Sequence, residues 1–155
     1  MKTLGLLLIS NTALFGCGQE RDLIPVGDKY QQPYTYIGQQ ANTVAKNFST
    51  EPNSVGNVIV DTNNHHFLFE SSGGAVVSYV DVSFNETSPC DQKRSFNSGR
   101  VLRALGIDPD SLELARERKH FHTYYDHKNK LKVSVSCLYD GGPLNVSFSR
   151  KYYGH

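Results

Sequence analysis

The residues best suited to chemistry in this chain are two histidines, His120 and His122, two positions apart. Alternating residue types around them predict a strand, so both imidazoles would leave the same face of a sheet. Such a pair can bind zinc when a third ligand is close, and Asp126 and His127 are the nearest candidates along the chain. No set of three ligands with suitable geometry is evident. We therefore expect no metal site and no cofactor.

Motifs for covalent or acid–base catalysis are not evident in the sequence. Serines are plentiful, but none lies in a Gly-x-Ser-x-Gly or Ser-x-x-Lys context. Nothing singles out a pair of carboxylates for sugar hydrolysis. The glycine pairs Gly73-Gly74 and Gly141-Gly142 fall between expected strands, so they predict hairpin turns and not phosphate-binding loops. The sequence therefore favours a protein without catalytic activity.

Polar side chains on the last three expected strands are the strongest candidate for a binding surface. Strands are predicted over 121–125, 131–137 and 144–149, because apolar and polar residues alternate there with a period of two. Aromatic and basic groups above small serines suit a protein or a glycan, and a hydrated surface without a ligand is the alternative. The polar positions are His120, His122, Tyr124, Lys132, Ser134, Ser136, Asn145, Ser147 and Ser149.

Hydrophobic periodicity and turn residues divide the preceding part of the chain into further elements. Asp108-Pro109 predicts the N-cap and first residue of a helix, and Gly106 is suited to ending the helix before it. The expected elements are a helix over 37–48, strands over 58–60, 67–69 and 76–84, and helices over 101–105 and 108–119.

The order of these elements predicts an α+β domain with an antiparallel sheet of about six strands. It consists of a helix, a three-strand meander, two short helices and a second three-strand meander. The strands within each meander are joined by turns that are too short for a parallel crossover. One sheet or two small units would both satisfy this order. The compact domain is expected over 37–155, after a polar, turn-rich segment over 17–36 that predicts a flexible tether.

The first seventeen residues have the pattern of a secretory signal. Lys2 precedes a short apolar run, and Leu14-Phe15-Gly16-Cys17 ends the segment. This ending resembles the lipobox of bacterial lipoprotein precursors. The resemblance implies that residues 1–16 are a signal peptide and that Cys17 becomes the first mature residue, with diacylglycerol on its sulfur and a fatty acid such as palmitate on its amine. The alternative is an ordinary cleaved signal that leaves Cys17 as a free or disulfide-bonded thiol.

The same resemblance has consequences for location and for the other cysteines. Gly18 stands where an aspartate commonly retains such lipoproteins in the inner membrane, which implies the outer membrane, facing the periplasm or the surface. With Cys17 lipidated, Cys90 and Cys137 remain as a pair in an oxidising compartment. A disulfide between Cys90 and Cys137 is therefore expected.

Charge is balanced overall and unevenly distributed along the chain. Once residues 1–16 are removed, the chain has 15 basic and 15 acidic side chains; residues 17–85 carry a net charge of −4 and residues 86–155 carry +4. Near-neutral charge and an envelope location argue against binding to nucleic acid.

These observations favour a lipid-anchored envelope protein with a non-enzymatic, protein-binding role. Its expected partners are the membrane, through the N-terminal lipid, and an envelope protein for which it acts as an inhibitor, an immunity factor or an assembly accessory. The alternatives are a hydrolase of an envelope polymer and a lipoprotein that binds a small ligand or a metal.

Overall fold

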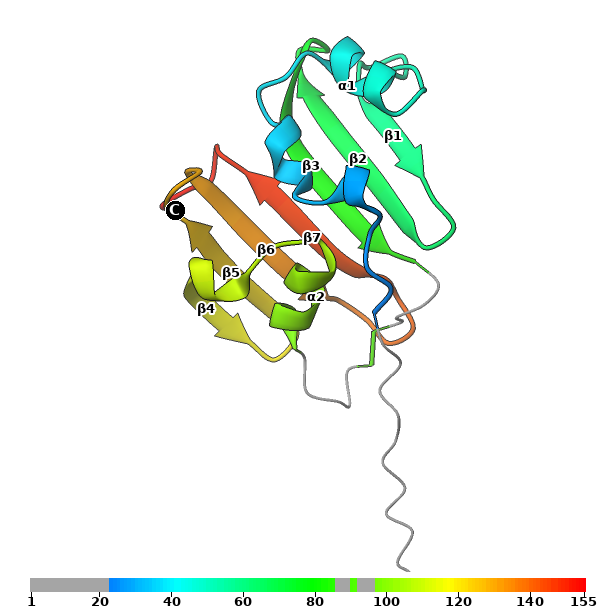
Figure 1. Cartoon of the computed structure of the whole chain (residues 1–155). Helices are drawn as coiled ribbons and strands as arrows, with labels where there is room; N and C mark the ends of the chain where they lie inside the picture. Colours follow the sequence, from blue (N-terminus) through cyan, green and yellow to red (C-terminus); the bar gives the residue numbers. More distant parts are fainter. Residues whose placement is uncertain (1–22, 86–89, 92–96) are drawn as a thin grey trace, which may run out of the picture.

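The described part of the chain forms one antiparallel sheet with helices on one of its faces (Figure 1). A computed structural model describes residues 23–85, 90–91 and 97–155. The strand order is β1-β2-β3-β7-β6-β5-β4. The expected α+β class is confirmed, with seven strands in the described residues where the sequence predicted about six. The strands are β1 (Val58–Asp61), β2 (His65–Ser72), β3 (Val76–Phe84), β4 (Glu113–Arg118), β5 (Phe121–Asp126), β6 (Leu131–Cys137) and β7 (Leu144–Ser149).

The helical elements of the described residues are short. The α-helices match two of the predicted ones, and the Asn97 side chain caps the second by accepting a hydrogen bond from the Arg100 amide. Buried residues such as Val44 and Leu102 attach the α-helices to the sheet. The helical elements are η1 (Asp28–Tyr30), η2 (Pro33–Tyr36), α1 (Ala41–Asn47), α2 (Ser98–Ala104) and η3 (Pro109–Ser111), where η denotes a 3-10 helix.

The two meanders form a single sheet because β3 pairs antiparallel with β7. Val82 lies opposite Val146 and Val80 lies opposite Phe148, so the apolar positions of the two strands coincide. This pairing places the last strand of each meander at the centre of the sheet (Figure 1). The arrangement as two separate units, which the sequence left open, is therefore not the one adopted.

The core lies between the helices and one face of the sheet. Strand side chains alternate between faces, so Val80 and Val82 point into the core while Asp81, between them, points to the other side. Aromatic and branched side chains dominate this layer, as expected for the half-buried surface of a sheet. Its largest fully buried members are Phe67, Phe69, Phe84, Phe148, Leu102, Leu105 and Leu131.

The segment predicted to be a helix over 108–119 is instead a 3-10 turn followed by an edge strand. Asp108 does cap the turn by accepting a hydrogen bond from the Asp110 amide, but η3 ends at Ser111. The following residues form β4, which pairs with β5 and whose side chains are all exposed. The helix prediction was wrong because an exposed, charged segment suits a helix or an edge strand, and only pairing with β5 selects the strand.

The described part of the predicted tether, residues 23–36, packs against the domain. The Val26 amide donates to the Ala104 carbonyl over 2.9 Å, and the Gln32 amide donates to the Leu105 carbonyl over 2.8 Å. The Tyr30 ring stacks on Phe48 with the ring centroids 5.3 Å apart. The tether prediction was therefore wrong for 23–36. The predicted signal peptide and Cys17 lie outside the described residues. No helix in the described ranges has the length and apolar character needed to span a membrane.

The predicted disulfide between Cys90 and Cys137 is confirmed. The two Cα atoms lie 5.3 Å apart, within the ordinary range for a disulfide. The Cys90 amide also donates to the Gly142 carbonyl over 2.8 Å, and the Gly141 amide donates to the Cys90 carbonyl over 2.8 Å. These contacts attach the segment around Cys90 to the turn that joins β6 to β7.

Candidate functional site

The structure divides the residues of the predicted binding surface between the two faces of the sheet. Lys132, Ser134 and Ser147 lie on the side away from the helices, together with Ser136, Asn145 and Ser149, as their registers show. His122 and Tyr124 lie on the helix-covered side, opposite core valines of β6, and are only 6% and 7% exposed. The prediction of one wet face was therefore wrong for these two residues.

The prediction failed because both faces of β5 carry a mixture of polar and aromatic side chains. Its alternative set, Phe121, Thr123 and Tyr125, contains polar and aromatic atoms just as the His122 and Tyr124 set does. Local alternation therefore does not decide which set is buried. A hydrogen-bonding partner on α2 decides it, because the polar atoms of His122 and Tyr124 can then enter the core without losing their hydrogen bonds.

That partner is Ser98, the first residue of α2. Its Oγ lies 2.6 Å from His122 Nδ1 and is also hydrogen-bonded to the Tyr124 hydroxyl. Burial lowers the pKa of His122, which favours the neutral imidazole. In one consistent arrangement, the Tyr124 hydroxyl donates to Ser98 Oγ, and the Ser98 hydroxyl donates to His122 Nδ1.

Together with Glu117, these residues have the composition of a hydrolase triad, with His122 Nε2 lying 3.8 Å from Glu117 Oε1. A nucleophile must reach its substrate, however, and Ser98 is only 3% exposed. Its hydroxyl is also shared between two buried partners. We therefore interpret the cluster as the polar contact that holds α2 against β5.

The substitution Ser98→Ala is expected to lower the free energy of unfolding by about 1–3 kcal/mol, because it leaves buried polar atoms of His122 and Tyr124 without their partner. Urea unfolding measures this change. The control Ser134→Ala, on the other face of the sheet, should change the free energy of unfolding by less than about 0.5 kcal/mol. Covalent labelling of Ser98 by a fluorophosphonate would contradict the structural interpretation.

The remaining residues of the proposed zinc set lie apart. His120 precedes β5, and its buried Nδ1 has no hydrogen-bond partner among the described residues. Asp126 accepts hydrogen bonds from the Asn129 amide and side chain. His127 contacts Glu113 and the Tyr153 hydroxyl. No group of three or more His, Cys, Asp or Glu side chains placed to hold a metal ion occurs within the residues described.

We call the side of the sheet away from the helices the open face. Its side chains form three rows across the strands, each running from β2 to β4 through neighbours in register. The central row is Leu68, Asp81, Ser147, Ser134, Thr123 and Arg116. One flanking row is His66, Ser83, Asn145, Ser136, Phe121 and Arg118. The other is Glu70, Tyr79, Ser149, Lys132, Tyr125 and Glu113.

The open face is divided by charge. Its β1–β3 side carries three carboxylates, whereas its β6 and β4 strands carry three cations and one carboxylate, and short serine side chains occupy the centre. The uneven charge along the sequence thus becomes an uneven charge across one surface, where it can orient an approaching partner. The carboxylates of the β1–β3 side are Asp61, Glu70 and Asp81, and the charged residues of β6 and β4 are Lys132, Arg116, Arg118 and Glu113.

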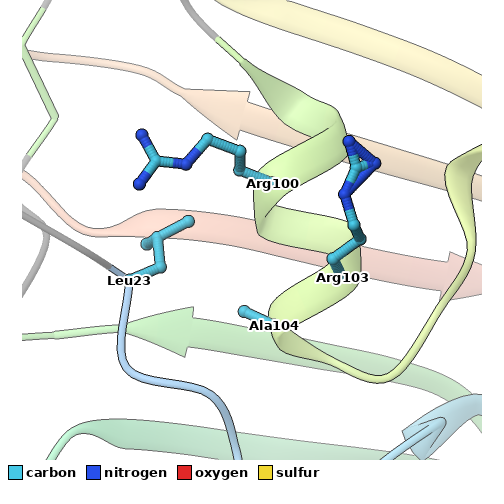
Figure 2. Close-up of a pocket in the computed structure, with 4 residues that line it drawn as sticks. All are labelled: Leu23, Arg100, Arg103 and Ala104. Atoms are coloured by element: carbon cyan, nitrogen blue, oxygen red, sulfur yellow. The ribbon is translucent and has the colours of Figure 1, made fainter. Parts of the chain in front are cut away.

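A pocket beside α2 lies on the helix-covered side. It is lined by Leu23, Arg100, Arg103 and Ala104 (Figure 2). Two guanidinium groups next to aliphatic side chains suit a molecule that joins an anionic group to an apolar part. The sequence did not point to this pocket, because Leu23 is far from α2 along the chain.

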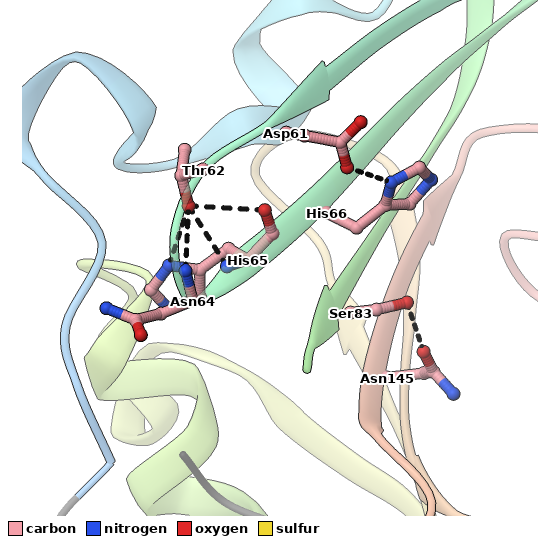
Figure 3. A network of polar contacts seen from close by, with 7 residues as sticks. All are labelled: Asp61, Thr62, Asn64, His65, His66, Ser83 and Asn145. Atoms are coloured by element: carbon pink, nitrogen blue, oxygen red, sulfur yellow. Dashed lines mark hydrogen bonds and ion pairs between the residues drawn. The ribbon is translucent and has the colours of Figure 1, made fainter. Parts of the chain in front are cut away.

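Short-range polar contacts fix several side chains of the open face (Figure 3). His66 Nδ1 lies 2.7 Å from Asp61 Oδ1, and the Ser83 hydroxyl donates to Asn145 Oδ1 over 2.6 Å. The Tyr79 hydroxyl lies 3.4 Å from Asp81 Oδ2. Asp81 is half-buried, and this burial raises the pKa of its carboxyl group.

Two buried histidines predict that stability falls in acid. Burial lowers the pKa of His65 and of His122, so the unfolded chain binds protons more readily than the native state below about pH 6.5. The free energy of unfolding should therefore decrease as the pH falls from 7 towards 5. The raised pKa of Asp81 acts in the opposite direction, at lower pH.

Urea unfolding at several pH values measures this dependence. The variant His122→Asn should show a shallower decrease between pH 7 and pH 5, because it lacks one of the two protonation sites. A wild-type free energy of unfolding that rises over this interval would contradict the prediction.

Comparison with known proteins gives no match. No family model matches the sequence, and no curated protein or solved structure matches it either. The residues of this chain and their geometry are therefore the basis for proposing a function.

Proposed function

We propose that this protein is a lipid-anchored lipoprotein of the bacterial envelope that binds another envelope protein through its open face. The observation that carries this proposal is the division of that face into an acidic side, a serine-rich centre and a basic side. The signal-like N-terminus ending at Cys17 supports the anchor, and the disulfide between Cys90 and Cys137 is consistent with an oxidising compartment.

The dimensions of the open face suit a protein partner. The three rows of side chains cross six strands about 4.8 Å apart and span about 600 Å². A standard protein interface covers roughly 800 Å² on each partner, so a partner must also contact the rim of the open face, because Thr123, Ser136 and Ser149 within the rows are buried. The short side chains of Ser134 and Ser147 leave room above the centre for larger side chains of the partner.

The partner is expected to carry its charges in the opposite order. Cations would face Asp61, Glu70 and Asp81, and carboxylates would face Lys132 and Arg116. A non-enzymatic protein that covers part of another protein in this way acts as an inhibitor, an immunity factor or an assembly accessory.

Site-specific photocrosslinking in intact cells tests this function. A photoreactive amino acid at Ser134, on the open face, should give a discrete adduct with one envelope protein, whereas the same group at Asn42, exposed on α1, should not. Adding Ser147→Arg should reduce the Ser134 adduct at least tenfold, because it places a long, charged side chain at the centre of the face.

Equal adducts from Ser134 and Asn42 would contradict the proposal. A Ser134 adduct that is unchanged by Ser147→Arg would also contradict it, because Ser147 lies directly opposite Ser134 in the sheet.

A further inference from the structure

Two large side chains project from the turn that joins β6 to β7. Leu138 is 64% exposed and Tyr139 is 61% exposed, the highest values among the large hydrophobic residues described apart from Val55. An apolar side chain next to a tyrosine is the composition that favours the interface between lipid headgroups and acyl chains. The turn is held in place by the disulfide at Cys137 and by the hydrogen bonds between Cys90 and Gly142 described above.

The described chain begins at the same end of the molecule. β6 ends at Cys137, which lies opposite Leu144, and Leu144 lies opposite Phe84 at the end of β3. The His65 ring packs edge-on against Phe84, and His65 Nε2 lies 3.0 Å from the Ile24 carbonyl. The first described residues and the β6–β7 turn are both found there in Figure 1.

Two arginines of α2 lie beside Leu23, the first described residue. Leu23 lines one pocket with Arg100, Arg103 and Ala104, and in Figure 2 the Leu23 side chain lies below that of Arg100. The guanidinium group binds phosphate through paired hydrogen bonds. Asp91 and Asp140 adjoin the hydrogen bonds between Cys90 and the β6–β7 turn, so the proposal relies on hydrogen bonds from guanidinium groups to individual phosphates and not on net positive charge.

The distance to the lipid limits how far this end can lie from a membrane. Leu23 follows Cys17 by six residues, which span at most about 21 Å when fully extended. If Cys17 carries lipid, as the proposed function requires, this end of the domain stays within that distance of the bilayer surface.

We propose that this end of the domain docks on the phospholipid surface. Leu138 and Tyr139 enter the headgroup region, and Arg100 and Arg103 bind lipid phosphates. The strands then stand upright on the membrane, since the β6–β7 turn lies at one end of the sheet. The open face is directed sideways, accessible to a protein partner in the same membrane or beside it.

Fluorescence quenching in vesicles tests this orientation. The lipidated full-length mature chain, with Leu138→Cys carrying a small environment-sensitive fluorophore, is reconstituted in phosphatidylethanolamine–phosphatidylglycerol vesicles that contain spin-labelled lipid. The matched control is Ser72→Cys, which is exposed at the opposite end of β2. We expect at least twofold quenching at position 138 and no quenching at position 72.

A second experiment tests docking in a chain that does not carry its own lipid. A Cys17→Ser chain with an N-terminal hexahistidine tag is tethered to nickel-chelating lipid and labelled at position 138 as before. Tyr139→Ser, or Arg100→Gln with Arg103→Gln, should each reduce the quenching at position 138 at least twofold, with circular dichroism confirming that the variants are folded.

Equal quenching at positions 138 and 72 in the tethered chain overturns the docking proposal. Quenching at position 138 that none of these substitutions changes also overturns it, since contact would then be non-specific. Absence of fatty acid on Cys17 in cells contradicts the proposed lipid anchor alone, because the tethered chain tests docking independently.

Discussion

Replacing Cys17 with serine is expected to move the protein from the membrane fraction to the soluble fraction. A serine hydroxyl cannot form the thioether to diacylglycerol that the lipobox resemblance implies for Cys17. Each methylene buried in the bilayer contributes about 0.8 kcal/mol, and even two acyl chains give stable anchoring. The change should therefore be close to complete, and ultracentrifugation of cell lysates followed by immunoblotting measures it.

Two controls distinguish a lost anchor from a damaged signal. Gly18→Ser changes the neighbouring residue and should leave the protein in the membrane fraction. Mass spectrometry of the wild-type N-terminal peptide should find diacylglycerol and fatty acid on Cys17, whereas the Cys17→Ser chain should carry neither group at that position. A Cys17→Ser protein that stays in the membrane fraction would contradict lipid anchoring.

Removing the disulfide is expected to cause the largest loss of stability. Cys90 and Cys137 are separated by 47 positions, and closing a loop of that size in the unfolded chain corresponds to about 4 kcal/mol in the chain-entropy treatment. The double variant Cys90→Ala/Cys137→Ala should have a free energy of unfolding lower by about 3–4 kcal/mol. Urea unfolding of the oxidised protein and of the variant measures the difference.

Reduction provides the matched control for this variant. Wild-type protein unfolded in dithiothreitol should lose a similar amount of stability, whereas dithiothreitol should not change the variant. An unfolding midpoint that is the same for oxidised and reduced wild-type protein would show that the bond contributes no stability.

The sequence by itself determined most of the strands and the disulfide. Val80 and Val82 alternate with Asp81, and Val133 and Val135 alternate with Ser134, so local pattern alone assigned one side of each strand to the core. The short turns required antiparallel pairing. Cysteine parity in an expected oxidising compartment identified the Cys90–Cys137 bond.

Local pattern failed where a segment has no strong preference of its own. Residues 113–118 are exposed and charged, and they become β4 only because β5 offers an edge to pair with. Residues 23–36 contain few apolar side chains, but Val26, Pro33 and the Tyr30 ring are covered by partners from distant parts of the chain. A window of neighbouring residues does not contain these partners.

The candidate site also depended on tertiary structure. Ser134 and Ser147 could be assigned to the outer surface from their own strands, because apolar residues flank them on both sides. The orientation of β5 could not be assigned from its own residues. Burial of His122 and Tyr124 becomes favourable only because Ser98 of α2 forms hydrogen bonds with their polar atoms. The charge division of the open face also depends on contacts between distant parts of the chain. The pairing of β3 with β7 brings the acidic and basic halves of the chain onto one surface. These strands are about sixty residues apart, as the Ser83–Asn145 contact across 62 positions shows.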